Sequence, residues 1–450
     1  MKKFILALSF SIGFHGIASA GYAEGVAAAN TGNFSQALAE WQPLAALGNA
    51  EAQASLGALY ENGRGVPRDY KQGADWYLRA ASQGHANAQF SLASMYDQGR
   101  GVTRDDAEAA TWYGRAADQG HVVAQFTLGE MYENGRGLWQ SDGRAAGWYR
   151  KSAEKGNANA QASLGQLYES GRGVVQDFKV AADWYQKAAD QGHMNAQARL
   201  AYLYATGKGV PQDSMRAEDL YRKAADQGHV VAQASLGSMY YTKQDFAQAV
   251  KWLRKAADQG HSGAQSALGV LYYKGEGVTK DFGQAIEWSR QAAAQGNAEG
   301  QATLGWIYYN GDGVKQDFRQ ASVWFRKAAE QGHATAQNKL GGMYEEGRGV
   351  PQDYIEAVSL YRLAAEQGHA DAQYNLGLTY YNGIGVGRDI VLSYVLFNLS
   401  AAASHPGASK KRTEMLSQMS NRELLEGQTI SAHWKSGTSL PTRTRTGWRS

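Results

Sequence analysis

The chain of 450 residues contains no cysteine, and this absence removes several classes of protein. Without cysteine there is no disulfide framework, no thiolate metal site and no lipid-modified cysteine. The stability of the folded chain must therefore come from packing alone.

Long apolar runs are also lacking. The run Phe4–Phe14 spans about 11 residues, whereas a helix that crosses a bilayer needs roughly 20. It follows Lys2 and Lys3 and precedes Ala18-Ser19-Ala20, which is the order found in a signal peptide. We therefore expect residues 1–20 to be removed after Ala20, no transmembrane segment, and a periplasmic or secreted location. The short lysine-containing start favours bacterial export over a eukaryotic secretory route.

An excess of charge of one sign is missing too. The 45 Lys and Arg residues nearly balance the 42 Asp and Glu residues, and several unpaired basic residues lie in the last part of the chain. Nucleic-acid binding would need a concentrated basic face, so we expect no nucleic-acid partner.

What the sequence does have is a repeat of about 36 residues. The motif A-x-A-Q-x-x-L-G-x-x-Y recurs along the chain, and one step is four residues shorter than the others. A fixed period of this size predicts a solenoid, in which each unit buries its apolar face against its neighbours. The leucines of the ten motifs are Leu56, Leu92, Leu128, Leu164, Leu200, Leu236, Leu268, Leu304, Leu340 and Leu376.

Each repeat reads as two helices joined by a glycine turn. Ala52, Leu56 and Leu59 share one face of a first helix, because their spacing follows the helical period. A G-x-G turn then precedes Asp69, which has the position of an N-cap for a second helix. In six of nine such repeats a Gln or Glu follows the aspartate by three residues, as Gln72 follows Asp69, and this pattern predicts a reciprocal capping box.

The three segments A-x-A-Q-x-x-L-G-x-x-Y, G-x-G-V and A-x-x-W-Y-x-K-A-A-x-Q-G together resemble the Sel-1-like repeat, a relative of the tetratricopeptide repeat. The resemblance implies an all-α fold, a right-handed superhelical α/α solenoid of tandem hairpins that serves as an adaptor between proteins. The boundaries expected from it are a signal peptide at 1–20, a tetratricopeptide-like capping hairpin at 21–48, ten repeats at 49–403 with a shortened one at 233–260, a C-terminal capping helix at 404–434, and a flexible basic tail at 435–450.

Seven of the ten histidines occupy one position of the repeat. Helices pack 8–10 Å apart, so histidines of successive repeats lie too far apart to share one metal ion. Asparagine takes the same position in other repeats, which indicates a role at the helix start, and we expect no metal and no cofactor. The seven are His85, His121, His193, His229, His261, His333 and His369.

The chain contains partial matches to one catalytic motif set, but they do not occur in the order that the enzyme requires. A penicillin-binding enzyme would show S-x-x-K, then S-D-N, then K-T-G. The chain offers Ser152 with Lys155, Ser141-Asp142-Gly143 and Lys435-Ser436-Gly437, and the second of these precedes the first. Some cysteine-rich relatives are linked to penicillin binding, but this chain has no cysteine. We predict no catalytic residues and no enzyme; a β-lactam or peptidoglycan-processing activity stays a remote alternative.

The variable positions of the first helix are the candidates for binding. Counted from the motif leucine, positions −2, +2 and +5 lie opposite the buried face. Position +5 is acidic in the first four repeats and is tyrosine in the sixth, seventh, eighth and tenth, with Trp306 beside them. Exposed aromatic residues contribute strongly at interfaces. The candidate partner-binding residues are Phe90, Phe126, Glu130, Tyr202, Tyr241, Tyr273, Trp306, Tyr309, Tyr374 and Tyr381.

These residues predict a concave surface that binds a protein or an extended peptide, so the chain is expected to be an exported scaffold. Two alternatives stay open. The tyrosines also suit packing against adjacent repeats, and an aromatic platform also suits a cell-wall or exopolysaccharide glycan.

Overall fold

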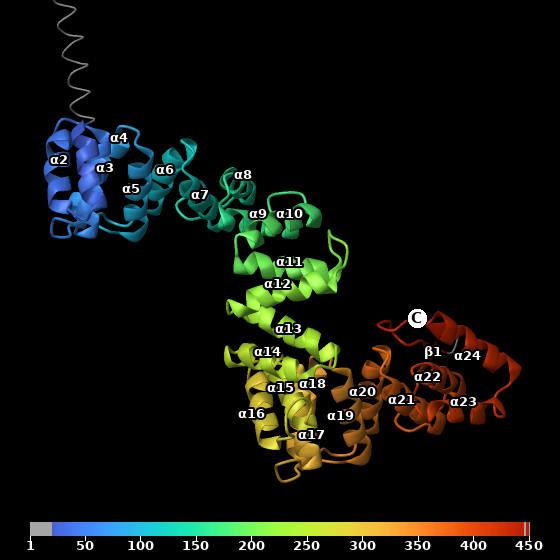
Figure 1. Cartoon of the computed structure of the whole chain (residues 1–450). Helices are drawn as coiled ribbons and strands as arrows, with labels where there is room; N and C mark the ends of the chain where they lie inside the picture. The colour runs from blue at the N-terminus through green and yellow to red at the C-terminus, as the bar shows by residue number, and fades with distance from the viewer. Residues whose placement is uncertain (1–19, 445–446, 450) are drawn as a thin grey trace, which may run out of the picture. The chain divides into compact units, whose positions relative to one another are not determined.

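The computed structural model describes residues 20–444 and 447–449, so the expected signal peptide lies outside the described residues except for Ala20. Between Gln227 and Gly228 the chain divides into two compact units, which we call the N-terminal unit and the C-terminal unit. Each is an array of α-hairpins in chain order (Figure 1), which confirms the predicted all-α solenoid.

Ten hairpins follow one another, each with a first and a second helix. The first helices are α3 (Ala50–Asn62), α5 (Ala86–Gln98), α7 (Val122–Asn134), α9 (Ala158–Ser170), α11 (Met194–Thr206), α13 (Val230–Thr242), α15 (Ser262–Lys274), α17 (Ala298–Asn310), α19 (Ala334–Glu346) and α21 (Ala370–Asn382). The second helices are α4 (Tyr70–Ser82), α6 (Asp106–Asp118), α8 (Asp142–Glu154), α10 (Phe178–Asp190), α12 (Ser214–Asp226), α14 (Phe246–Asp258), α16 (Phe282–Ala294), α18 (Phe318–Glu330), α20 (Tyr354–Glu366) and α22 (Ile390–Ala402).

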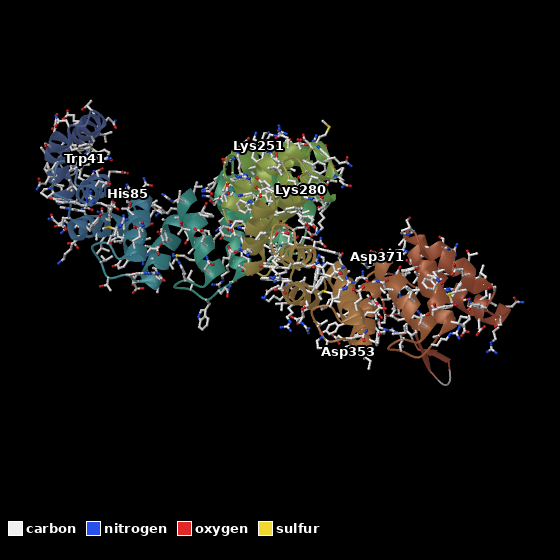
Figure 2. All side chains as sticks on the ribbon, turned by 90° about the horizontal axis from the view of Figure 1, so that it is seen from below. Trp41, His85, Lys251, Lys280, Asp353 and Asp371 are labelled. Carbon is white, nitrogen blue, oxygen red and sulfur yellow. The ribbon has the colours of Figure 1, made fainter. Side chains whose placement is uncertain are left out.

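A hairpin also precedes the first repeat. Residues 20–30 are helical and pack against α2 (Phe34–Ala46). Trp41, labelled in Figure 2, donates its indole N–H to the carbonyl of Tyr22 at 3.2 Å. Gly25 makes this contact possible, because a Cβ there would lie 2.2 Å from the Trp41 ring.

Within a hairpin a small residue lets the two helices approach. Leu56 and Leu59 are buried on α3, as predicted. A Cβ at Gly57 would lie 2.7 Å from the ring of Tyr77 on α4, so this position needs a small residue; the second and fifth repeats have Ala93 and Ala201 there. Each fully buried leucine contributes roughly 1.5–3 kcal/mol relative to an exposed one.

The G-x-G turn clamps each repeat to the one before it. Gly101 has a φ of +71°, and a Cβ on it would lie 2.2 Å from the carbonyl oxygen of Tyr70, the first residue of the preceding second helix. The sixth repeat lacks this turn, and Asp245 follows α13 almost directly.

The predicted aspartate N-caps form, but the reciprocal capping boxes do not. Asp69 accepts the backbone N–H of Gln72 at 3.0 Å. The second half of a capping box would need the backbone N–H of Asp69, and that group already donates to the carbonyl of Tyr60 at 2.9 Å. Gln72 therefore bonds to the carboxylate of Asp69 instead. A complete capping box occurs at Ser420 and Glu423, which the repeat pattern does not cover.

Buried glutamine pairs connect successive hairpins. Gln53, the glutamine of the A-x-A-Q motif, donates to the carbonyl of Ala45 at 3.0 Å and accepts from Gln83 at 2.7 Å. Equivalent pairs recur at Gln89/Gln119, Gln161/Gln191, Gln197/Gln227, Gln233/Gln259, Gln265/Gln295, Gln301/Gln331 and Gln337/Gln367. A buried amide needs such partners, because an unpaired one costs free energy.

The C-terminal end differs from the prediction in two respects. Two helices, α23 (Ala408–Leu416) and α24 (Asn421–His433), replace the single capping helix expected at 404–434, because Ser420 caps a new helix start. The tail expected to be flexible is in part packed: Leu440 is 2% exposed. We call Lys435–Leu440 the C-terminal strap. Two short strands follow, β1 (Thr442–Thr444) and β2 (Gly447–Arg449), which pair antiparallel.

Candidate functional site

The first helices form the inner layer of each unit. Contacts between equivalent helices of successive repeats are strongest among first helices, namely α3 with α5, α13 with α15, α15 with α17 and α17 with α19. In a curved array the inner layer is the more crowded one, so the first helices line the concave side of each unit. We call their positions −2, +2 and +5 the inner stripe.

The acidic residues at +5 are held by the second helix of their own repeat. The hydroxyl of Tyr77 donates to Glu61 at 2.8 Å, and Tyr149 donates to Glu133 at 2.6 Å. The pairs Tyr185/Glu169 and Tyr361/Glu345 are equivalent. Burial raises the pKa of these tyrosines, so their hydroxyl groups stay protonated donors.

Arginines of the next repeat neutralise several of these carboxylates. Arg136 lies 3.0 Å from Asp97, and Arg172 lies 3.2 Å from Glu133. Both arginines come from the middle position of a G-x-G turn. The acidic half of the inner stripe is therefore largely a set of contacts within and between repeats.

Tyrosine at +5 replaces the acid where the second helix has no tyrosine to donate. Phe325 stands at the position of Tyr77, and there the +5 residue is Tyr309. Its hydroxyl accepts from Arg348 at 3.0 Å, and that of Tyr273 donates to Asp312 at 2.7 Å. Burial, and then the bond to Asp312, raise the pKa of Tyr273. These tyrosines reach the G-x-G turn of the next repeat.

The remaining aromatic residues at +5 are held in similar ways. The ring of Tyr241 lies 5.4 Å from that of Phe246 between centroids. The hydroxyl of Tyr381 bonds to Gln418, beyond the last repeat. Tyr273, Tyr309 and Tyr381 therefore pack against the adjacent repeat or cap, as in the alternative interpretation of the tyrosines.

Aromatic residues at −2 pack against the next hairpin or their own second helix. Phe90 stacks on His121 at 4.5 Å between ring centroids, and Tyr374 stacks on His405 at 4.2 Å. The ring of Phe126 lies 5.7 Å from that of Tyr149. All three rings are half-buried, so only part of each is available to a ligand.

The +2 positions are the most open part of the inner stripe. Glu130 and Tyr202 are exposed, the latter to 36%, and Gln166 lies between them in sequence and is exposed too. In the C-terminal unit, Trp306 is half-buried, and the Lys339 ammonium lies 4.9 Å from the centroid of its ring. Of the ten candidate residues, Glu130 and Tyr202 are the ones least engaged in building the fold, whereas the ring of Trp306 packs 5.5 Å from that of the buried Phe325 between centroids.

The histidines cap the first helices, as predicted. Ring Nδ1 accepts the backbone N–H three residues on, at 3.1 Å for His85 (Figure 2) and 3.2 Å for His193. Asn49 does the same with its side-chain oxygen at 2.9 Å. Burial lowers the pKa of His121, His193 and His369, which favours the neutral ring that a cap requires. Within residues 20–444 and 447–449, no group of three His, Asp or Glu side chains is arranged to hold a metal ion.

The residues that resembled a penicillin-binding motif have structural contacts. Ser152 is fully buried, and its hydroxyl donates to the carbonyl of Val122 at 2.8 Å. Lys155 donates to the carbonyl of Gly120 at 2.7 Å. Ser141 is the N-cap of α8. A buried serine that already donates its hydroxyl proton is poorly placed to act as a nucleophile.

Sequence reasoning missed the glutamine pairs and the exchange of acid for tyrosine at +5. Both had a signal in the repeat. The glutamines recur at fixed spacing in A-x-A-Q and in A-x-Q-G, and acid at +5 accompanies tyrosine sixteen residues on, as with Glu61 and Tyr77. The C-terminal strap carries no repeat signal.

Comparison with known proteins places the chain in a family. The Sel1 repeat matches ten segments, 50–85, 86–121, 122–157, 158–193, 195–229, 230–261, 262–297, 298–333, 334–369 and 370–405. A protective antigen of uropathogenic Escherichia coli strains, which displays an SLR fold, is 36% identical over 93% of this chain and 91% of its own, with a TM-score of 0.85. A Sel1 repeat protein from Oxalobacter formigenes is 29% identical over 60% of this chain and 96% of its own, with a TM-score of 0.45. No curated protein sequence matches.

Two further findings bear on function. None of the helices described is both long and apolar enough to cross a membrane. Sel1 repeat solenoids are commonly protein-interaction scaffolds and are generally not catalytic. The ten matched segments cover most of the chain, which therefore belongs to the Sel1 repeat family.

Proposed function

We propose that this chain is an exported scaffold that binds a partner protein or an extended peptide along the inner stripe. The observation that carries the proposal is the row of exposed +2 side chains Glu130, Gln166 and Tyr202 on three successive first helices. The residues that stay constant between repeats build the hairpins. The +2 side chains vary between repeats and are exposed to solvent.

The structure narrows the residues that we assign to binding. Tyr273 and Tyr309 bond to the next repeat, so their removal is expected to lower stability as well as binding. Glu130 and Tyr202 at +2 carry less of the fold, whereas Trp306 also packs on Phe325.

A protein partner fits this row better than a glycan. A carboxylate, an amide and an aromatic ring in line offer hydrogen bonds and one stacking surface to an extended backbone. A sugar ring needs an open aromatic face. The Tyr202 ring has the Lys208 ammonium 5.3 Å from its centroid, and Lys208 also donates to its hydroxyl at 3.1 Å, so its face is partly occupied.

In-cell photocrosslinking tests the proposal. A photoreactive residue in place of Tyr202 or Trp306 should capture a defined protein, identified by mass spectrometry, and the same residue in place of exposed Glu330 on α18 should not. The partner should be lost from the Tyr202 crosslink when Glu130 is changed to Ala. Equal capture at Glu330, or glycan-array binding that Trp306→Ala abolishes without any protein capture, would contradict a protein-binding inner stripe.

Export is tested separately. Fractionation and N-terminal sequencing of the protein from its host should find it outside the cytoplasm with Gly21 as the first residue. A protein retained in the cytoplasm with Met1 intact would show that the scaffold acts inside the cell.

A further inference from the structure

The N-terminal unit has a groove on its second-helix side, away from the inner stripe. It lies between α10 and α12, with α11 as its floor, and measures about 630 Å³. Gln186 and Asp190 line it from α10, Tyr204 from α11, and Met215 and Leu220 from α12. Met215 is 84% exposed at its edge.

The groove exists because the fifth repeat has a leucine, Leu220, where most other repeats have tryptophan. Seven repeats carry tryptophan at the position of Leu220, and Trp76 and Trp148 pack against apolar clusters formed with preceding repeats. At the position of Gln186, Arg150 donates to the hydroxyl of Tyr168 at 2.7 Å, and Arg362 bonds to Tyr380 in the same way. Leu220 of the fifth repeat, in place of tryptophan, therefore leaves the groove open, and Gln186 of the fourth repeat lines it.

The equivalent groove five repeats later is occupied by the chain itself. It lies between α20 and α22, and there too leucine, Leu396, replaces the tryptophan. The C-terminal strap lies against α20: the N–H of Gly437 donates to the carbonyl of Glu366 at 2.7 Å, and the N–H of Leu440 donates to the Glu366 carboxylate at 2.8 Å. Arg362 donates to the carbonyl of Leu440 at 3.3 Å.

Two further features describe how the strap fits. The Leu440 side chain is buried in the same apolar cluster as Leu396. A Cβ on Gly368 would lie 2.8 Å from the hydroxyl of Ser436, so glycine is what lets the strap come close. The strap turns before its leucine, because the N–H of Thr438 donates to the carbonyl of Lys435 at 3.1 Å and Gly437 has a φ of +86°. The occupied groove therefore holds a tight turn of small residues followed by one aliphatic side chain.

The empty groove keeps the acidic side chain and the open glycine that meet the strap, but Gln186 replaces the arginine that donates to the Leu440 carbonyl. Gln186 and Asp190 form a hydrogen-bonded pair at 2.7 Å where Arg362 and Glu366 form an ion pair at 3.6 Å. Gly192 has no atom within 4 Å of its hypothetical Cβ among the described residues, so this position is open. The matching positions are Gln186 with Arg362, Asp190 with Glu366, Gly192 with Gly368, Tyr204 with Tyr380, and Leu220 with Leu396.

We propose that the groove between α10 and α12 binds a segment of a partner protein that makes a tight turn before an aliphatic side chain, in the way that the groove between α20 and α22 binds the strap. The segment places a leucine or similar aliphatic side chain over Leu220 and donates its backbone N–H to Asp190. A second copy of this chain is not the occupant, because each copy already holds its own strap through three hydrogen bonds. This surface is separate from the inner stripe and does not depend on it.

Binding of a synthetic peptide to the full chain tests this proposal. The probe is residues 434–441 of this chain, WKSGTSLP, labelled for fluorescence anisotropy. We expect saturable binding that Leu220→Trp weakens at least tenfold, because tryptophan fills the groove as it does in seven sister repeats. The same change at Leu78 on α4, a leucine that is 40% exposed and away from the groove, should leave the affinity within twofold.

One more variant of the chain and one altered peptide keep the test independent of folding. Asp190→Ala should weaken the peptide at least fivefold without a change in melting temperature, and a peptide with alanine in place of its leucine should not bind. Unchanged affinity in Leu220→Trp would mean that the peptide displaces the strap, and would overturn the proposal. A concentration-dependent dimer that Leu220→Trp abolishes would also overturn it, because the occupant would then be a second copy.

Discussion

Histidine caps the first helices here in the position that Ser, Thr, Asp or Asn usually takes. The cap works only while Nδ1 is unprotonated, since a protonated ring nitrogen cannot accept the backbone N–H. Asn49 and Asn157 make the same bond without a titrating group. The repeat therefore contains its own control for the effect of histidine protonation.

The first prediction is that acid destabilises this chain through its histidine caps. Burial lowers the folded-state pKa of His121, His193 and His369 below 6.5, so the unfolded chain takes up protons first. Their contribution is complete above pH 6.5 and is lost as the pH falls through the lower folded-state pKa. Each cap is worth about 1 kcal/mol.

Thermal unfolding followed by circular dichroism between pH 8 and pH 5 measures this effect. The triple variant with asparagine at these three positions should show a flatter dependence of melting temperature on pH than the natural chain. Carboxylates titrate equally in both proteins, so the difference isolates the histidines. Identical slopes would refute the prediction.

The glutamine pairs give a second prediction at this scale. Lys155 stands where other repeats have the donor glutamine, and the buried side-chain oxygen of Gln125 then has no hydrogen-bond partner among the described residues. Lys155→Gln should supply that donor, and should keep the bond to Gly120, because Gln295 makes both equivalent bonds. A gain of about 1 kcal/mol is expected.

Removal of a donor glutamine in another repeat provides the matched control. Gln83→Ala removes the donor to buried Gln53 and should cost about 1–3 kcal/mol. Hydrogen exchange detected by mass spectrometry reads both effects locally, as slower exchange in α7 for Lys155→Gln and faster exchange in α3 for Gln83→Ala. Slower exchange in both variants would show that the pairs do not stabilise the chain.

At the scale of helices and turns, spacing alone predicted most of the hairpin. Leu56 and Leu59 follow the helical period, and Asp69 and the glycine turn mark the boundary between two helices. The reciprocal capping box failed, because the backbone N–H of Asp69 donates to Tyr60, a contact that depends on how two helices meet. The spacing of residues along one helix does not predict how two helices meet.

The two glycines of a hairpin differ in what they tolerate, and this gives the third prediction. Gly84 and Gly101 both have positive φ, but a Cβ on Gly84 meets nothing within 4 Å, whereas one on Gly101 would lie 2.2 Å from the Tyr70 carbonyl. Gly84→Ala should cost about 1–2 kcal/mol from backbone strain alone. Gly101→Ala should cost clearly more, because the turn must also detach from the preceding repeat. Thermal melts of the two single variants compare them, and equal losses would exclude the clamp.

For the whole molecule, the repeat predicted the solenoid but not its division into two compact units. The sixth repeat lacks the G-x-G turn that elsewhere clamps a repeat to the second helix before it, and the division falls where that repeat begins. The strap was missed for another reason. Its leucine docks about 75 residues away in sequence, beyond the reach of any periodic signal.

The fourth prediction is that each unit folds without the other. In solenoids the stability is a sum of repeats and their nearest-neighbour contacts, so a cut between repeats removes one interface only. The N-terminal unit has its own cores, including that around Trp41 and that around Tyr149, and the C-terminal unit has its own around Phe325 and Leu440. Fragments 21–227 and 228–450 should both be helical by circular dichroism.

A fragment that ends inside a hairpin provides the control for this division. Fragment 21–209 retains α11 but lacks α12, against which Leu200 and Leu203 are otherwise buried. It should melt at a lower temperature than fragment 21–227, because the exposed apolar face of α11 has lost its partner within the repeat. If fragment 21–227 is unfolded while the whole chain is folded, the two units depend on each other and the division at Gln227 has no energetic meaning.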